Sequence, residues 1–126
     1  MEKQIINTKN APAPIGPYNQ AVLTGNLLFV SGQIALHPET NQLIQDDIKT
    51  ETRQVMENLK AILTAAGMDF ANVLKSTIFI TNMNDFAQIN EVYGSYFSDA
   101  YPARETVQVA ALPKGVNVEI SVIASK

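Results

Sequence analysis

The order of hydrophobic periodicities along the chain constrains its fold more than any other feature. Alternation with a period of two, which is typical of strands, marks the beginning of the sequence and returns near its end. Between these runs lie two stretches whose apolar residues recur at three- and four-residue spacing, which is typical of amphipathic helices. We expect strands at 3–7, 18–23, 27–34, 42–45, 73–81, 104–110 and 116–124, and helices at 47–66 and 85–98.

This order predicts an α+β fold with one mixed sheet and both helices packed on the same face. Because two helices cannot cover both faces of a sheet, the other face stays open. We expect that open face to be too apolar for a plain solvated surface and too polar for a dry core, which suits an interface between subunits. The residues expected on it are Lys75, Thr77, Phe79, Thr106, Gln108, Glu119 and Ser121.

The ends of both predicted helices carry recognisable signals. Asp46 or Asp47 can cap the start of the first helix, and Gly67 fits the left-handed position just past its end. Asp85 and Gln88 have the spacing of a capping box for the second helix.

Composition restricts the function classes more than the fold. The length of 126 residues fits one domain, covering 1–126. With no cysteine, only one histidine and no glycine-rich phosphate loop, the chain is expected to bind no metal and no organic cofactor. The net charge of −3 and the pI of about 5 argue against a nucleic-acid partner or an anionic membrane surface. Because no apolar run is long enough to span a bilayer and no leader is recognised, we expect a cytoplasmic protein.

Two charged residues in the last two strands are the strongest candidates for chemistry. Arg104 opens one strand, and its planar guanidinium fits a carboxylate. Glu119 lies in the middle of the next strand, where a carboxylate is costly unless it has a partner or a function. Such a pair can grip an acid and move a proton. The alternatives are a surface ion pair for Arg104 and, for Glu119, a salt bridge to a lysine across a subunit interface.

Several short motifs are spread over essentially the whole chain. They are Ile15-Gly16-Pro17-Tyr18, Ser31-Gly32-Gln33-Ile34, Glu91-Val92-Tyr93, Pro102-Ala103-Arg104 and, after a Pro113-Lys114-Gly115 turn, Val118-Glu119-Ile120. Together they resemble the YjgF/RidA family. Each motif is weak alone, but their order in a chain of this length is specific. The resemblance implies a chorismate-mutase-like α+β protomer, assembled as a homotrimer around a sheet-lined centre, with sites in the clefts between neighbours.

The resemblance also implies an activity. It is the hydrolysis of reactive 2-imino or enamine acids, such as 2-iminobutanoate and 2-iminopropanoate, to 2-keto acids and ammonia without a cofactor. Arg104 and the backbone of Gly32 would hold the substrate carboxylate. Glu119 and the main-chain carbonyl of Thr106 would position a water; many relatives have cysteine in place of Thr106.

Two further residues are substrate-binding candidates by the same resemblance, and each has a structural alternative. Tyr18 either donates its hydroxyl to the substrate or is a half-buried tyrosine at the protomer surface. Asn90 either reaches the cleft through its side-chain amide or is a solvated helix position. Gly32 is either a close-approach position for a ligand or a β-bulge. His37 lies in a His-Pro turn and is not expected to be catalytic.

One position departs from the family pattern. Glu105 follows Arg104 where relatives usually have a small residue. Because adjacent strand residues point to opposite faces, we expect Glu105 to point away from the Arg104 side chain. If it turned inward, it would neutralise Arg104 and weaken carboxylate binding.

Other functions stay open at this point. A regulatory protein could bind a keto acid in the same inter-subunit cleft and need Arg104 more than Glu119. A ribonuclease or translation inhibitor, activities attributed to some relatives, is disfavoured by the acidic charge balance and by the absence of a basic, aromatic stripe. A holdase chaperone leaves no testable pattern in the sequence.

Overall fold

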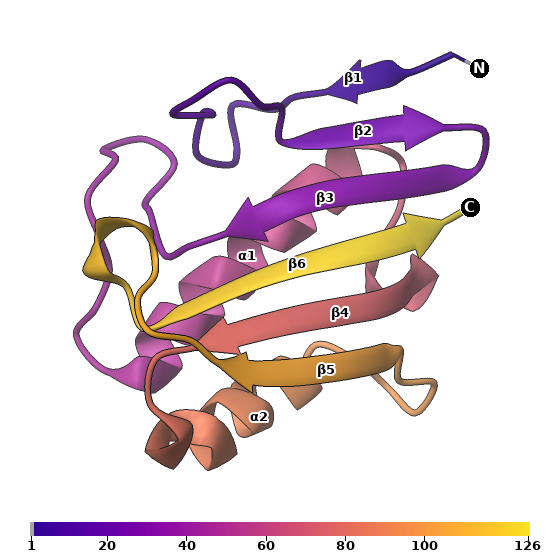
Figure 1. Cartoon of the computed structure of the whole chain (residues 1–126). Coiled ribbons are helices and arrows are strands. Elements are labelled where there is room, and N and C mark those ends of the chain that lie inside the picture. Colours follow the sequence, from indigo (N-terminus) through magenta and orange to yellow (C-terminus); the bar gives the residue numbers. More distant parts are fainter. Residues whose placement is uncertain (1) are drawn as a thin grey trace.

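The protein, described here over residues 2–126 of a computed structural model, forms one six-stranded sheet with two helices against it (Figure 1). The strands and helices are β1 (Gln4–Ile6), β2 (Ala21–Thr24), β3 (Leu27–Gln33), α1 (Ile48–Ala65), β4 (Val73–Ile80), α2 (Phe86–Gly94), β5 (Ala103–Gln108) and β6 (Val118–Ser125). Single 3-10 turns lie at Phe70–Asn72, Met83–Asp85 and Pro113–Gly115. The predicted order of elements and the α+β class are confirmed. The strand expected at 42–45 is wrong, because that segment makes only an isolated bridge between Leu36 and Leu43.

The strand order in the sheet is β1-β2-β3-β6-β4-β5. All neighbours are antiparallel except β4 and β5, which run parallel. A parallel pair needs a crossover connection, and α2 supplies it. The last strand, β6, enters between β3 and β4, whereas β5 forms an outer edge. This topology therefore places β5 two strands away from β6.

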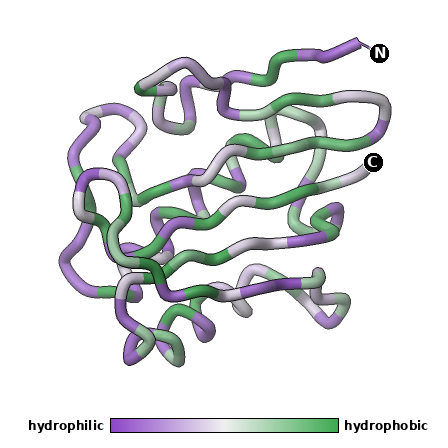
Figure 2. Tube along the Cα trace, viewed as in Figure 1, coloured by the Kyte–Doolittle hydropathy of each residue, from purple (hydrophilic) through white to green (hydrophobic). Residues whose placement is uncertain are grey.

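Both helices cover one face of the sheet, as predicted (Figure 1). The inward stripe of α1 includes Val55, Leu59 and Ile62, all fully buried. It packs on the inward residues of the central strands, among them Ile78 and Ile120. Figure 2 shows hydrophobic and more hydrophilic residues alternating along the strands, which is the pattern that leaves one face for the core and one open.

The start of α1 matches the prediction, whereas α2 differs from it at both ends. Asp47 caps α1 by accepting a hydrogen bond from the Thr50 backbone N–H at 2.8 Å. The capping box predicted at Asp85 and Gln88 is wrong, because Asp85 makes no side-chain cap bond and is the last residue of a 3-10 turn that Asn82 caps.

The second helix ends at Gly94 rather than at 98. Beyond Gly94 the chain turns through hydrogen bonds between residues three apart in the sequence, such as that from the Phe97 N–H to the Gly94 carbonyl. This turn lets the Phe97 ring pack 4.9 Å from the Tyr93 ring and 5.4 Å from that of Phe70. Aromatic packing at the end of the helix thus replaces the predicted further turn.

The open face differs from the prediction at two positions on β5. Arg104, Thr106 and Gln108 stand in register with Ser76, Ile78 and Ile80, which face the helices. Placing Thr106 and Gln108 on the open face is therefore wrong. The apolar residues of β5 are too few to reveal the phase of this strand, and the parallel register with β4 determines it.

A β-bulge corrects one further expectation. Simple alternation along the predicted strand 73–81 would put Leu74 on the same buried face as Ser76, but Leu74 is 53% exposed. The register between β4 and β6 shifts between Val73 and Lys75, so that one extra residue turns outward there.

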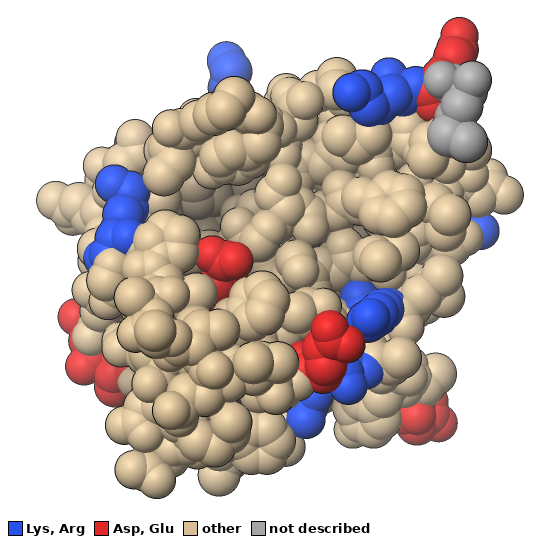
Figure 3. Space-filling model, in the orientation of Figure 1, with Lys and Arg blue, Asp and Glu red and all other residues tan. Residues whose placement is uncertain are grey.

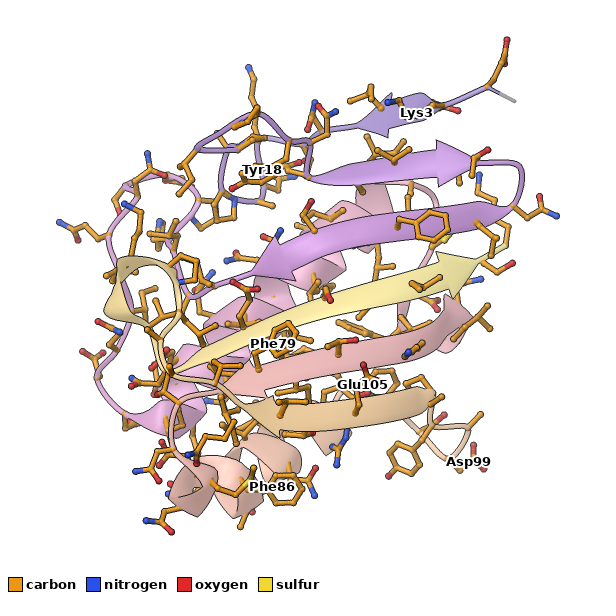
Figure 4. All side chains as sticks on the ribbon, viewed as in Figure 1. Lys3, Tyr18, Phe79, Phe86, Asp99 and Glu105 are labelled. Carbon is orange, nitrogen blue, oxygen red and sulfur yellow. The ribbon has the colours of Figure 1, made fainter. Side chains whose placement is uncertain are left out.

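The remaining predicted residues do share the open face. Phe79 stands opposite Glu119 and Thr77 opposite Ser121, while Lys75 and Glu105 form a salt bridge there. Figure 4 shows Phe79 and Glu105 on the side away from the helices. Figure 3 shows that charged groups are sparse across this face.

Candidate active site

The sequence-predicted site residues fall into two groups on opposite faces of the sheet. Tyr18, Gly32 and Glu119 gather around a cavity on the open-face side, called here the glutamate half-site. Arg104 and Asn90 meet on the helix side, with Thr106 next to them on β5, and form the arginine half-site. With strands about 4.8 Å apart, β5 lies roughly 10 Å from β6. One protomer therefore does not bring Arg104 and Glu119 together.

The glutamate half-site is an apolar cavity of about 370 Å³ with Glu119 as its only charged residue. The loop before β2, the end of β3 and the turn before β6 form its walls. The lining residues are Pro12, Ala13, Ile15, Tyr18, Ser31, Gly32, Gln33, Ile34, Leu36, Pro113 and Glu119.

The Glu119 carboxylate lies directly over the backbone of Gly32. A Cβ atom added to Gly32 would stand 2.5 Å from Oε2 and 2.8 Å from Cδ of Glu119. Only glycine leaves room for the carboxylate at this place. The register between β3 and β6 also shifts between Val30 and Gln33, so that Gly32 is both a bulge position and a close-approach position.

Burial sets the protonation behaviour of Glu119. Loss of hydration raises the pKa of its carboxyl above the ordinary value. Within residues 2–126 no lysine or arginine forms a salt bridge with it. A carboxylate with raised proton affinity beside an apolar cavity is suited to accept and return a proton.

Tyr18 lies in the loop ahead of β2, where Figure 4 shows it. Its hydroxyl oxygen accepts a hydrogen bond from the Ile15 N–H at 3.3 Å, so its own proton can still be donated to a ligand. The loop is held by Gln20, which is 2% exposed and donates through Nε2 to the carbonyls of Ala11 and Pro12. The sequence carried no signal for this role of Gln20.

A buried carboxylate that the sequence analysis missed anchors the start of β6. Glu51 on α1 is fully buried, and its two oxygens accept bonds from the backbone N–H and the side-chain amide of Asn117, each at 2.8 Å. Asn117 precedes Glu119 by two residues, so this clamp fixes the strand that carries the candidate base. The available signal was the position of Glu51 four residues before Val55, on the buried stripe of α1.

In the arginine half-site the guanidinium contacts a side-chain amide and two aromatic rings of α2. Arg104 donates through Nη1 to the side-chain oxygen of Asn90. Its Cζ lies 5.6 Å from the centroid of the Phe86 ring and 5.2 Å from that of the Tyr93 ring. The adjoining cavity of about 470 Å³ is lined by Asn90, Tyr93, Gly94, Tyr101, Pro102 and Arg104. Both aromatic residues fall within the predicted helix 85–98, and the sequence gives no sign of their contact with Arg104.

Glu105 points away from Arg104, as predicted. Its Oε1 lies 3.2 Å from Nζ of Lys75, on the opposite face of the sheet. The guanidinium therefore keeps its charge available for a ligand.

Both the side-chain hydroxyl and the main-chain carbonyl of Thr106 lack a partner within the described chain. Its hydroxyl oxygen is buried without a hydrogen-bond partner in the described chain. Just after β5, the Val109 N–H donates to the Ile80 carbonyl, so the odd-numbered residues of β5 also direct their backbone groups toward β4. Because these directions alternate along a strand, the Thr106 carbonyl points to the outer edge, where no strand of the described chain lies.

Other candidate chemistry lies outside both half-sites. Nδ1 of His37 accepts a hydrogen bond from the Glu39 N–H at 3.2 Å and belongs to a turn away from Glu119 and Arg104. Over residues 2–126, His, Cys, Asp and Glu form no group of three or more able to hold a metal ion. Across the same residues, the helices are too short or too polar to cross a membrane.

A family model described as Endoribonuclease L-PSP matches residues 8–126. The chain belongs to the YjgF/RidA family. A RutC family protein of Pyrococcus horikoshii is 53% identical, over 98% of this chain and 98% of its own length. A bovine protein named 2-iminobutanoate/2-iminopropanoate deaminase is 48% identical, over 97% of this chain and 89% of its own length.

The fold of this YjgF/RidA protein matches solved structures closely. TdcF of E. coli, whose crystal structure contains bound serine, superposes with a TM-score of 0.94 and is 47% identical, over 98% of both chains. The expected fold is therefore confirmed for the protomer.

Proposed function

We propose that this YjgF/RidA protein hydrolyses 2-imino acids, such as 2-iminobutanoate and 2-iminopropanoate, to the 2-keto acid and ammonia without a cofactor. The observation that carries the proposal is the Glu119 carboxylate, which lies over Gly32 at an apolar cavity and has a raised pKa. The name of the bovine relative supports the same activity.

We propose further that each active site forms between neighbouring subunits of a homotrimer. The arginine half-site of one subunit would face the glutamate half-site of the next. Support comes from the separation of the two halves in one protomer and from exposed apolar residues on the open face, such as Phe29 and Val107. The number three comes from the family resemblance.

Substrate binding follows from the arginine half-site. One N–H of Arg104 is already used by Asn90, which leaves other N–H groups to bind the substrate carboxylate in a fork. The Gly32 backbone of the neighbouring subunit would contact the same substrate. The bound serine in TdcF is a small carboxylic acid of comparable size, which supports a ligand of this class.

The chemistry needs only a water and a protonated imine. Glu119 and the Thr106 carbonyl would hold the water against C2. The water oxygen attacks C2, the C=N π electrons move to nitrogen, and Glu119 takes the proton of the water. Glu119 then returns this proton to the amine, the C–N bond breaks as C=O forms, and the remaining hydroxyl proton leaves to solvent. Positioning of water and carbon supplies much of the rate increase.

A keto-acid-binding regulator remains the second candidate, because the arginine half-site can bind a carboxylate without Glu119. Glu119→Gln separates the two functions: an enzyme loses turnover while it still binds 2-ketobutyrate. A ribonuclease has less support, because the only histidine, His37, lies outside both half-sites.

The decisive experiment couples the protein to a threonine dehydratase and follows the loss of the imine by trapping with semicarbazide. We expect wild type to accelerate the loss and Arg104→Ala to lose most of that acceleration. Imine hydrolysis by Arg104→Ala at the wild-type rate would contradict the proposed mechanism. No acceleration by wild type would favour the regulator.

A further inference from the structure

Arg104 is exposed on the outer strand β5, yet its guanidinium contacts three side chains. The arginine side chain is long and flexible, and it normally samples many rotamers. Here the hydrogen bond to Asn90 and the contacts with the Phe86 and Tyr93 rings all come from one face of α2, where the three residues recur at helical spacing.

Tyr93 is itself fixed at both ends. The residue is only 4% exposed, and its hydroxyl donates to Oγ of Ser76 at 2.8 Å. Ser76 is fully buried on β4 and stands in register with Arg104. The Phe97 ring also packs against Tyr93, with the centroids 4.9 Å apart. The ring under the guanidinium therefore has one position, determined by the sheet.

We propose that Tyr93, assisted by Phe86 and anchored by Ser76, is a positioning residue that holds the Arg104 guanidinium ready for a substrate carboxylate. The inference rests on the proposed role of Arg104 in binding that carboxylate. It assigns a function to the Ser76–Tyr93 hydrogen bond, which otherwise serves only the core.

The physical reason lies in how the two aromatic rings contact the guanidinium. Ring faces attract the cation without using its N–H groups. Asn90 takes one N–H, so the others stay available in a fixed direction. A side chain that is already ordered loses less entropy when the ligand binds. At about 0.5–1 kcal/mol for an exposed cation–π contact, loss of one ring is expected to weaken carboxylate binding by roughly two- to fivefold.

The test compares two ligands that differ only in the carboxylate: 2-ketobutyrate and its methyl ester. Their affinities are measured by calorimetry or competition for wild type, Phe86→Leu, Tyr93→Leu, Tyr93→Phe and Ser76→Ala. We expect Phe86→Leu and Tyr93→Leu each to bind the acid roughly two- to fivefold more weakly, with the ester unchanged. Tyr93→Phe and Ser76→Ala keep the ring and should lose less. In an Arg104→Ala background the same changes should have no further effect.

Each outcome decides a different question. Equal weakening of acid and ester would assign Tyr93 a purely structural role and overturn the inference, as would acid binding that is unchanged in Phe86→Leu and Tyr93→Leu. Because Tyr93 is buried, Tyr93→Leu is also checked by its melting temperature; Phe86 is only partly buried, so Phe86→Leu keeps the test valid if Tyr93→Leu unfolds. Equal affinity of the wild type for acid and ester would instead overturn the proposed carboxylate site, and this inference with it.

Discussion

Replacing Gly32 with alanine puts a methyl group where the Glu119 carboxylate lies. The new Cβ would stand 2.5 Å from Oε2, whereas ordinary contact begins near 3.4 Å, so the carboxylate must move by about 0.9 Å. The three nearest atoms all belong to the Glu119 side chain, which can swing away without moving a strand. The backbone of Gly32 is outside the left-handed region, so alanine is tolerated there.

A displacement of about 1 Å at a reacting group costs on the order of 100-fold in rate. We therefore expect Gly32→Ala to hydrolyse the imine about 100-fold more slowly, with a free energy of unfolding within about 1 kcal/mol of wild type. The coupled threonine dehydratase assay measures the rate, and urea denaturation measures the stability.

The control is a double-mutant cycle with Glu119→Ala, which removes the atoms that the new methyl group would meet. In that background Gly32→Ala should cause no further loss of rate. A wild-type rate for Gly32→Ala, or an equal loss in both backgrounds, would refute the idea that the glycine acts through Glu119.

The remaining predictions concern charge and stability. Because burial raises the pKa of Glu119 and the reaction needs its carboxylate form, the rate should fall on the acid side as pH drops through that raised pKa, and Glu119→Gln should remove this limb from any residual rate. Because the raised pKa means that the folded state binds this proton more tightly than the unfolded state, the charged carboxyl destabilises the fold at a pH above that pKa. The melting temperature of Glu119→Gln minus that of wild type should therefore be more positive at pH 7 than at pH 4. Glu51→Ala leaves both Asn117 donors unsatisfied and should lower the free energy of unfolding by roughly 3 kcal/mol in urea titrations. An unchanged free energy of unfolding would show that the Glu51–Asn117 hydrogen bonds do not stabilise the fold. Glu105→Ala should leave KM unchanged, since Glu105 pairs with Lys75 on the other face; a clear fall in KM would show that it restrains Arg104 after all.

The sequence predicts most accurately which residues face the core in those helices and strands that have one strongly apolar face. The stripe of α1 and its Asp47 cap, and the alternation of β6 that puts Glu119 on the open face, are reproduced by the structure. The phase of β5 was not predictable, because it depends on parallel pairing with β4 rather than on its own pattern, and Thr106 was misplaced for that reason.

The site was predicted as a set of residues rather than as a geometry. Gly32 and Glu119 are neighbours because β3 and β6 pair, although their positions lie far apart in the sequence. The contact of Arg104 with Tyr93 depends on how α2 crosses back over β5. Long-range pairings of this kind leave no local periodicity, so single-chain patterns do not reveal them.

Mixing two inactive variants tests the central claim most directly. Arg104→Ala keeps the glutamate half-site and Glu119→Gln keeps the arginine half-site. If the halves of one site come from different subunits, co-refolding equal amounts should give about a quarter of the clefts both intact halves, and about a quarter of the wild-type rate. Mixed protein that is as inactive as each variant alone, with mixed assemblies verified by mass, would place both residues in one chain's site and contradict the account.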